Sequence, residues 1–92
     1  MTEIYYTEEF RRRYGELPIP IQRKAERRER LFRENPFHPS LKTEKLQPLQ
    51  KEYWSFRVDR NYRVIFRFGE ANRVYFVTCG HHQWIYRYLL TR

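Results

Sequence analysis

The spacing of apolar and polar residues is helical in the first third of the chain. A short apolar stretch at residues 3–6 predicts a strand, and Thr7 can then cap a helix over 8–15 that begins with acids and ends with arginines before Gly15. A second helix is expected from Pro20 to Glu34, where the prolines that follow stop it. One face of that helix is apolar and consists of Ile21, Ala25, Leu31 and Phe32, with Arg28 as the single polar residue on it.

Beyond residue 50 the period of the apolar residues changes to two, which is typical of strands. The intervening residues 36–50 contain Pro36, Pro39 and Pro48 and predict a loop with a little strand within 41–46. The expected strands are 53–58, 62–68 and 73–79, and the turns between them are 59–61 and 69–72. The order predicts one α+β domain over residues 1–92. The N-terminal strand and two helices would form two layers with a mainly antiparallel four-stranded sheet, packing on one of its faces.

Alternation along two of these strands places three arginines on one side of the sheet. Trp54, Phe56 and Val58 share a face in one strand, and the apolar residues of 62–68 share a face in the next. If the apolar sets face the helices, three arginines stand together on the open face: Arg57, Arg63 and Arg67. Guanidinium groups in this arrangement would bind phosphate, since each can grip two oxygens. The alternative is that they are ordinary solvated residues on an outer face.

The segment after the last predicted strand adds groups that exchange protons. Residues 80–87 read Gly-His-His-Gln-Trp-Ile-Tyr-Arg, and histidine titrates near neutrality while tyrosine donates or accepts hydrogen bonds. Metal-free RNA cleavage needs such groups: the 2′-hydroxyl attacks the adjacent phosphate, a base and an acid move protons, and cations stabilise the phosphate. If alternation continues, His81 and His82 point in opposite directions, and only one of them serves the site.

Charge and composition narrow the class of protein. The chain carries 19 basic and 11 acidic residues, a net charge of +8, which favours polyanions or acidic proteins as partners. Cys79 is the single cysteine, so no intrachain disulfide is possible, and it is expected to be a small buried residue. Cys79 and His81, with His38, fall short of a convincing metal site, so no metal and no other cofactor is expected. The sequence shows neither a signal peptide nor a membrane span, and a cytoplasmic protein is expected.

A family resemblance rests on the same residues. The run Trp54-x-x-Arg57-Val58-x-x-x-Tyr62-Arg63-Val64-Ile65-Phe66, followed by Gly80-His81-His82 and Ile85-Tyr86-Arg87, resembles the RelE/ParE superfamily of toxins from type II toxin–antitoxin modules. The Leu-Lys-Thr-Glu-Lys-Leu segment at 41–46 is also similar. The resemblance covers nearly the whole chain and implies the element order β-α-α-β-β-β.

For the nuclease members, the resemblance implies an endoribonuclease that cleaves mRNA in the ribosomal A site. It also implies a cognate antitoxin as inhibitor, contacts with ribosomal RNA, and binding of operator DNA only through the antitoxin complex. By position, Arg63 would be the transition-state arginine, His82 would occupy a catalytic slot, and Tyr86 would orient or stack on the substrate, with Arg57 as a further basic group. Additional RNA contacts are expected from Lys45, Lys51, Arg60, Arg67, His81 and Arg87. The general base stays open among Glu44, Glu52, Lys45 and Lys51.

Two other functions are also compatible with the sequence. The ParE-like branch inhibits DNA gyrase by protein binding without cutting RNA, and a plain basic RNA-binding module would bind RNA without releasing fragments. The histidines and Tyr86-Arg87 favour the nuclease branch. The basic face of the second helix would suit an acidic antitoxin segment: Arg23, Lys24, Arg27, Arg30 and Arg33. Its alternative is a solvated face, partly neutralised by Glu26, Glu29 and Glu34.

Overall fold

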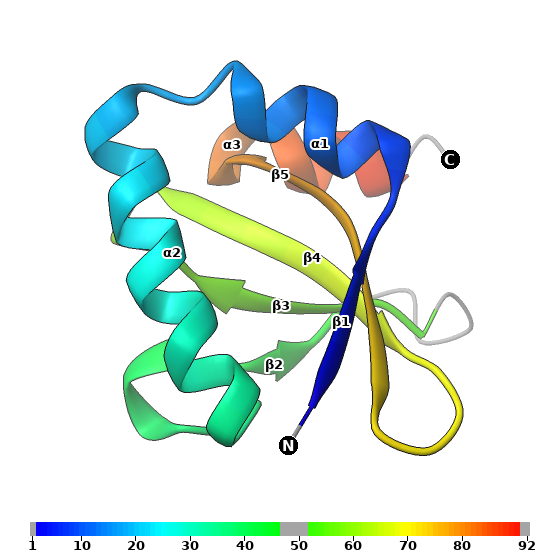
Figure 1. Cartoon of the computed structure of the whole chain (residues 1–92). Coiled ribbons are helices and arrows are strands. Elements are labelled where there is room, and N and C mark those ends of the chain that lie inside the picture. The colour runs from blue at the N-terminus through cyan, green and yellow to red at the C-terminus, as the bar shows by residue number, and fades with distance from the viewer. Residues whose placement is uncertain (1, 47–51, 91–92) are drawn as a thin grey trace.

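The predicted strands and helices form in the expected order (Figure 1). The structure is a computed structural model that describes residues 2–46 and 52–90. Its elements are β1 (Glu3–Tyr6), α1 (Glu8–Gly15), α2 (Ile19–Glu34), the 3-10 helix η1 (Pro39–Leu41), β2 (Glu44–Lys45), β3 (Trp54–Arg57), β4 (Tyr62–Phe68), β5 (Arg73–His81) and α3 (His82–Leu90). None of the helices described is both long and apolar enough to cross a membrane.

The strands form one mixed sheet of five strands in the order β1-β5-β4-β3-β2. β1 runs parallel to β5, whereas the other pairs are antiparallel. The prediction of four strands was therefore wrong by one: Glu44 and Lys45 pair with Ser55 and Trp54 as a short edge strand. Two residues are too few to show alternation, so the sequence offered only the hint of strand within 41–46.

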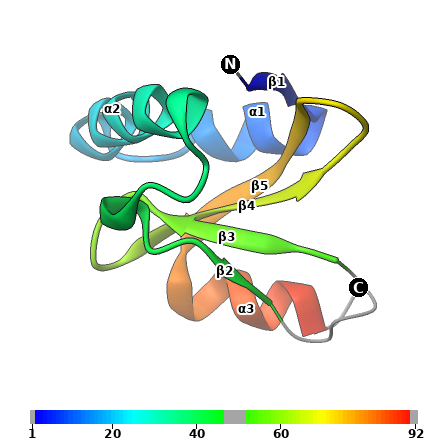
Figure 2. The same ribbon diagram turned by 90° about the horizontal axis from the view of Figure 1, so that it is seen from below.

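Helices α1 and α2 cover one face of the sheet, as predicted (Figure 2). The Oγ1 atom of Thr7 accepts the N–H of Phe10 at 3.1 Å and so caps α1. From α2, the fully buried ring of Phe32 lies 5.0, 4.9 and 5.3 Å, between ring centroids, from three phenylalanines of the sheet: Phe56, Phe66 and Phe76. This aromatic cluster is the centre of the core on the α1–α2 side.

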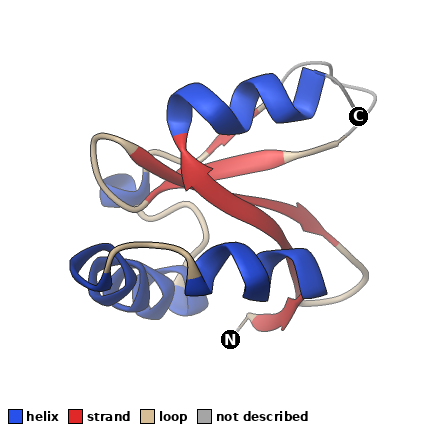
Figure 3. Cartoon of the chain, turned by 90° about the horizontal axis from the view of Figure 1, so that it is seen from above, coloured by secondary structure: helices blue, strands red, loops and turns tan. Residues whose placement is uncertain are grey.

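The opposite face of the sheet is covered by α3 and is not open (Figures 2 and 3). Ile85 of α3 is fully buried and packs with Leu46 and Ile65 in a second apolar cluster. The expectation of two layers with an open face was therefore wrong. The helix begins at His82, directly after the last residue of β5, and the Nδ1 atom of His81 accepts the N–H of Gln83 at 3.2 Å at its start. No loop separates the strand from the helix, so the change of structure was hard to see in the sequence.

A bulge in β5 determines on which face of the sheet each residue at the end of this strand lies. Ile65 pairs with Thr78, but the next residue, Phe66, pairs with Phe76. The register therefore shifts by one, which exchanges the faces of the residues that follow. As a result Phe76 and Cys79 both belong to the core on the α1–α2 side, and Gly80 lies opposite Arg63 on the other side.

Candidate active site

Arg57 and Arg63, here called the arginine pair, lie directly opposite each other on β3 and β4. They share a face with Ile65, on the side of the sheet that α3 covers. Arg57 is exposed, whereas Arg63 is 9% exposed. Like charges in such a position ordinarily repel each other, so the two side chains need to be held or to share an anion.

Backbone carbonyls of the β3–β4 turn hold the guanidinium of Arg63. Its Nη1 atom donates to the carbonyl oxygens of Asp59 at 2.8 Å, Arg60 at 3.0 Å and Tyr62 at 3.1 Å. An arginine has further N–H donors on Nη2 and Nε. Bonds to a charged group are stronger than neutral ones, so the turn fixes the orientation of this guanidinium and leaves it donors for a phosphate.

His82 stands at the start of α3, close to Arg63. Its backbone N–H donates to the carbonyl oxygen of Asn61 at 2.7 Å. Desolvation, the neighbouring His81 and the positive charge of Arg63 lower the pKa of His82 below its ordinary value. Tyr86 follows one helical turn later on the same side of α3, partly buried against the Ile65 and Ile85 cluster. The structure thus brings Arg57, Arg63 and His82 to one place, with Tyr86 beside them.

His81 is the last residue of β5, one position beyond Gly80, the residue that lies opposite Arg63. It pairs with Tyr62 across the sheet and packs its ring edge-on at 5.5 Å. It also lines a cavity of about 230 Å³ together with Tyr62 and Trp84. Its ring nevertheless stacks on His82, with centroids 4.7 Å apart. The expectation that the two histidines point in opposite directions was wrong, because the strand period ends between them.

The predicted cluster of three arginines is reduced to two. Arg67 shares the face of Arg63, but it is four residues further along β4, about 13 Å at ordinary strand spacing. Its guanidinium lies 4.3 Å from the centroid of the Tyr75 ring. Of the other expected RNA contacts, Arg60 is exposed in the turn and Arg87 is exposed on α3. Lys51 lies outside the residues that the structure describes.

The register separates the candidates for the general base. Glu44 pairs with Ser55, which pairs with Ile65, so Glu44 is on the face of the arginine pair. Lys45 pairs with Trp54 and therefore faces the opposite side, with its Nζ atom 5.7 Å from the Trp54 ring. Glu52 is exposed before β3 begins. The geometry thus favours Glu44 over Lys45.

Cys79 is a core residue. It is 2% exposed, and burial raises the pKa of its thiol to about 12, so a thiolate nucleophile is not formed near neutral pH. Within residues 2–46 and 52–90, no three histidine, cysteine, aspartate or glutamate side chains gather closely enough to hold a metal ion.

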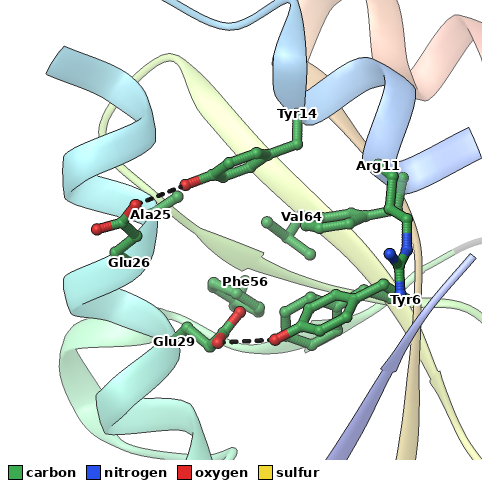
Figure 4. A pocket seen from close by; sticks show the side chains of 10 residues that line it. Tyr6, Arg11, Tyr14, Ala25, Glu26, Glu29, Phe56 and Val64 are labelled. Carbon is green, nitrogen blue, oxygen red and sulfur yellow. Dashed lines mark hydrogen bonds between the residues drawn. The ribbon is translucent and has the colours of Figure 1, made fainter. Parts of the chain in front are cut away.

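A separate apolar cavity of about 370 Å³ lies between α1 and α2 (Figure 4). Two hydrogen bonds cross its rim: Tyr6 donates to Glu29 at 2.8 Å and Tyr14 to Glu26 at 3.1 Å. Burial, with the bond to Glu26, raises the pKa of Tyr14 to about 12. Among the residues that the structure describes, those that line it include neither histidine nor lysine: Tyr6, Phe10, Arg11, Tyr14, Ala25, Glu26, Glu29, Phe56, Val64 and Phe76. The group that can exchange protons near neutral pH, His82, lies instead on the opposite face of the sheet, beside the arginine pair.

Gly80 allows α3 to approach the sheet. A Cβ atom built at this position would lie 2.8 Å from the Trp84 ring, closer than real Cβ atoms come. Gly80→Ala is therefore expected to displace Trp84 and to lower the free energy of unfolding by roughly 1–3 kcal/mol, measured by urea denaturation. Gly15→Ala is the matched control, because a Cβ at Gly15 meets no atom within 4 Å. Equal stability of the two variants would contradict the prediction.

The comparisons with known proteins place this architecture in a family. The family model described as "RelE-like toxin of type II toxin-antitoxin system HigB" matches residues 25–79, more than half of the chain. The chain is a RelE-like toxin of the HigB family. The matched part of this toxin includes α2 from Ala25 onward and the arginine pair, but it ends before His82. No curated protein matches the sequence significantly.

Solved structures of similar toxins share the fold. The YoeB/ParE toxin from Agrobacterium tumefaciens has a TM-score of 0.71 at 23% identity, covering 89% of this chain and 99% of that chain. YafQ from E. coli strain BL21(DE3) has a TM-score of 0.75 at 18% identity, covering 94% and 99%. The RelB-RelE antitoxin-toxin complex from Methanococcus jannaschii has a TM-score of 0.71 at 19% identity, covering 90% and 95%. The RelE-like toxin therefore has the α+β fold of these proteins.

Proposed function

We propose that this toxin is a metal-independent endoribonuclease that cleaves mRNA on the ribosome. The observation that carries the proposal is the arginine pair beside His82, with Arg63 held by the carbonyls of the β3–β4 turn. A phosphate between the two guanidiniums would neutralise their repulsion and receive their hydrogen bonds. The 2′-hydroxyl of the RNA would then attack that phosphate, and the arginines would stabilise the charge that develops on its oxygens.

Proton transfer in the proposed reaction needs groups on both sides of the phosphate. Glu44 comes from β2, on one side of the arginine pair, and His82 follows β5, on the other. A carboxylate can only accept a proton, so Glu44 would take the proton of the 2′-hydroxyl. His82 would protonate the leaving 5′-oxygen. Tyr86 would stack on or orient the nucleotide from its place one turn along α3.

The role of His82 as the acid gives a pH dependence. Its pKa lies below the ordinary value of 6.5 because of desolvation, His81 and Arg63, and the protonated fraction falls as the pH rises through that pKa. Single-turnover cleavage is therefore expected to slow as the pH rises from about 5 to 8, and His82→Gln should lose this dependence. A rate that rises over the same range would instead identify His82 as the base.

Mapping of mRNA 5′ ends during induced expression in a bacterium tests the proposed function. Breaks clustered within translated codons are expected for the wild type, and none for Arg63→Ala. Growth arrest with intact mRNA and arrested DNA supercoiling would instead indicate the gyrase-inhibiting branch. RNA bound without fragments would indicate a plain binding module.

We propose an acidic segment of a cognate antitoxin as the protein partner. YafQ and RelE have been solved in antitoxin complexes. In this chain, α2 and the β3–β4 turn form a basic groove of about 550 Å³, lined by Lys24, Arg27, Arg28, Arg30, Leu31, Val58 and Asp59. Cations around an apolar floor suit a segment that alternates carboxylates with apolar side chains. Arg33, expected on this surface, instead binds Glu29 at 3.3 Å.

A further inference from the structure

The turn between β3 and β4 is closed by one carboxylate. The Oδ1 atom of Asp59 accepts the backbone N–H groups of Asn61 and Tyr62, both at 2.9 Å. The N–H of Val58 donates to the carbonyl of Tyr62 at 2.9 Å and completes the turn. Aspartate closes turns in this way because its short side chain reaches backbone groups two and three residues ahead. The path of residues 59–62 therefore depends on the Asp59 side chain.

The carbonyls of the same turn reach the two groups that the proposed reaction uses. Those of Asp59 and Arg60 accept from Nη1 of Arg63, and that of Asn61 accepts the backbone N–H of His82 at 2.7 Å. Arg63 and His82 come from different elements, β4 and α3. A single short turn thus sets the position of one relative to the other.

We propose that Asp59 is a positioning residue for RNA cleavage: its carboxylate shapes the β3–β4 turn so that the turn's carbonyls hold the guanidinium of Arg63 and the first residue of α3, His82. This inference rests on the proposed function for the roles of Arg63 and His82. Asp59 itself does not touch the reacting atoms. It acts through backbone geometry, and a small displacement of a catalytic group is costly to the rate.

The charge of Asp59 has a second contact, which offers a competing explanation. Its Oδ2 atom lies 3.5 Å from Nζ of Lys24 on α2. Partial burial opposes ionisation, but the N–H groups of Asn61 and Tyr62 and the Lys24 ammonium outweigh it and lower the pKa of Asp59. The Lys24 side chain is 46% exposed, and exposed ion pairs contribute little to stability. The turn hydrogen bonds are therefore the contacts on which the proposal depends.

Two conservative variants separate turn geometry from charge. Asp59→Asn keeps an oxygen at Oδ1 and loses the charge, whereas Asp59→Glu keeps the charge and places the carboxylate one methylene further away. Glu70→Ala is the control, because Glu70 is an exposed acid in the turn between β4 and β5. Each variant is purified as the full chain. Single-turnover cleavage of RNA on ribosomes is measured at saturating toxin, together with hydrogen exchange of the His82 amide.

The expected result is that Asp59→Glu slows cleavage by about 10- to 100-fold and accelerates exchange at the His82 amide. Asp59→Asn should stay within roughly threefold of wild type in both, since asparagine closes the same turn. A wild-type rate and a protected His82 amide in Asp59→Glu would overturn the proposal. A larger defect in Asp59→Asn than in Asp59→Glu would also overturn it, in favour of the Lys24 ion pair, because only the asparagine variant loses the charge. If Asp59→Glu does not fold, a defective but folded Asp59→Asn is sufficient to overturn it.

The amide measurement also separates this proposal from the proposed function. If Arg63→Ala cleaves RNA as fast as the wild type, the proposed reaction fails. The loss of His82 amide protection in Asp59→Glu would still establish that the turn positions α3, because that measurement does not depend on cleavage. Exchange of the Val64 and Cys79 amides in the central strands serves as the check that each variant is folded.

Discussion

Arg63→Ala is expected to lower the single-turnover rate of RNA cleavage by about 100- to 1000-fold and to permit normal growth during induced expression. Arg63 is 9% exposed and opposite Arg57, so its removal takes the better-fixed of the two cations from the proposed phosphate site. Cations that are already aligned before the reaction stabilise the transition state more than the bound RNA, because the negative charge on the phosphate oxygens is greatest in the transition state. The loss should therefore be in the rate at saturation more than in RNA binding.

Two further variants make the Arg63 result interpretable. Arg63→Lys keeps a positive charge but cannot reproduce the planar fork, so it should recover little of the rate. Arg73→Ala removes an exposed arginine of β5 and should cleave like the wild type. Circular dichroism must show that Arg63→Ala folds, since the substitution removes a donor from the carbonyls of Asp59 and Arg60. Full activity of a folded Arg63→Ala would reject the assignment.

Phe32→Ala is expected to remove a large share of the free energy of unfolding of this chain. Phe32 is fully buried, and its ring contacts those of Phe56, Phe66 and Phe76. Removing a buried phenylalanine ring costs about 3–5 kcal/mol, whereas domains of this kind have a total stability of only about 5–15 kcal/mol. Urea denaturation followed by circular dichroism measures the change in the free energy of unfolding.

Phe37→Ala is the matched control for Phe32. The side chain of Phe37 is 53% exposed, although its ring contacts those of Trp54 and Phe68. Loss of such partly exposed ring contacts should cost about 1 kcal/mol. If the two variants were destabilised equally, the aromatic cluster around Phe32 would not be the centre of the core.

Long elements with a clear period were predictable from the sequence, and short or abrupt ones were not. The apolar face predicted for α2 contains Ala25 and Phe32, which are both buried. Alternation also assigned the residues of β4 to the correct faces of the sheet. β2 has only two residues. α3 follows β5 without a linker, so the predicted strand ended at residue 79 and alternation was then assumed for both His81 and His82. No helix was expected there, and the face of the sheet that α3 covers was taken to be open.

The sequence located the arginine pair but not what surrounds it. Alternation is a local rule, so it placed Arg57 and Arg63 on one face, yet the bulge opposite Ile65 and Phe66 has no glycine or proline to mark it. The carbonyl contacts of Arg63 depend on the path of a turn and could not be read from residue types. Asp59 was visible as a turn residue, and the Asx-turn tendency of aspartate was the signal that could have directed attention to its carboxylate.

The parallel pairing of β1 with β5 also dictates when during synthesis this toxin can become harmful. Residues 3–6 pair with residues 73–76, so β1 must wait until β5 has been made, and the long loop between the two strands must close. His82 and Tyr86 emerge later still. A ribosome that has not yet made residue 86 therefore carries a chain without the proposed site, and products that stop before β5 are expected to be harmless.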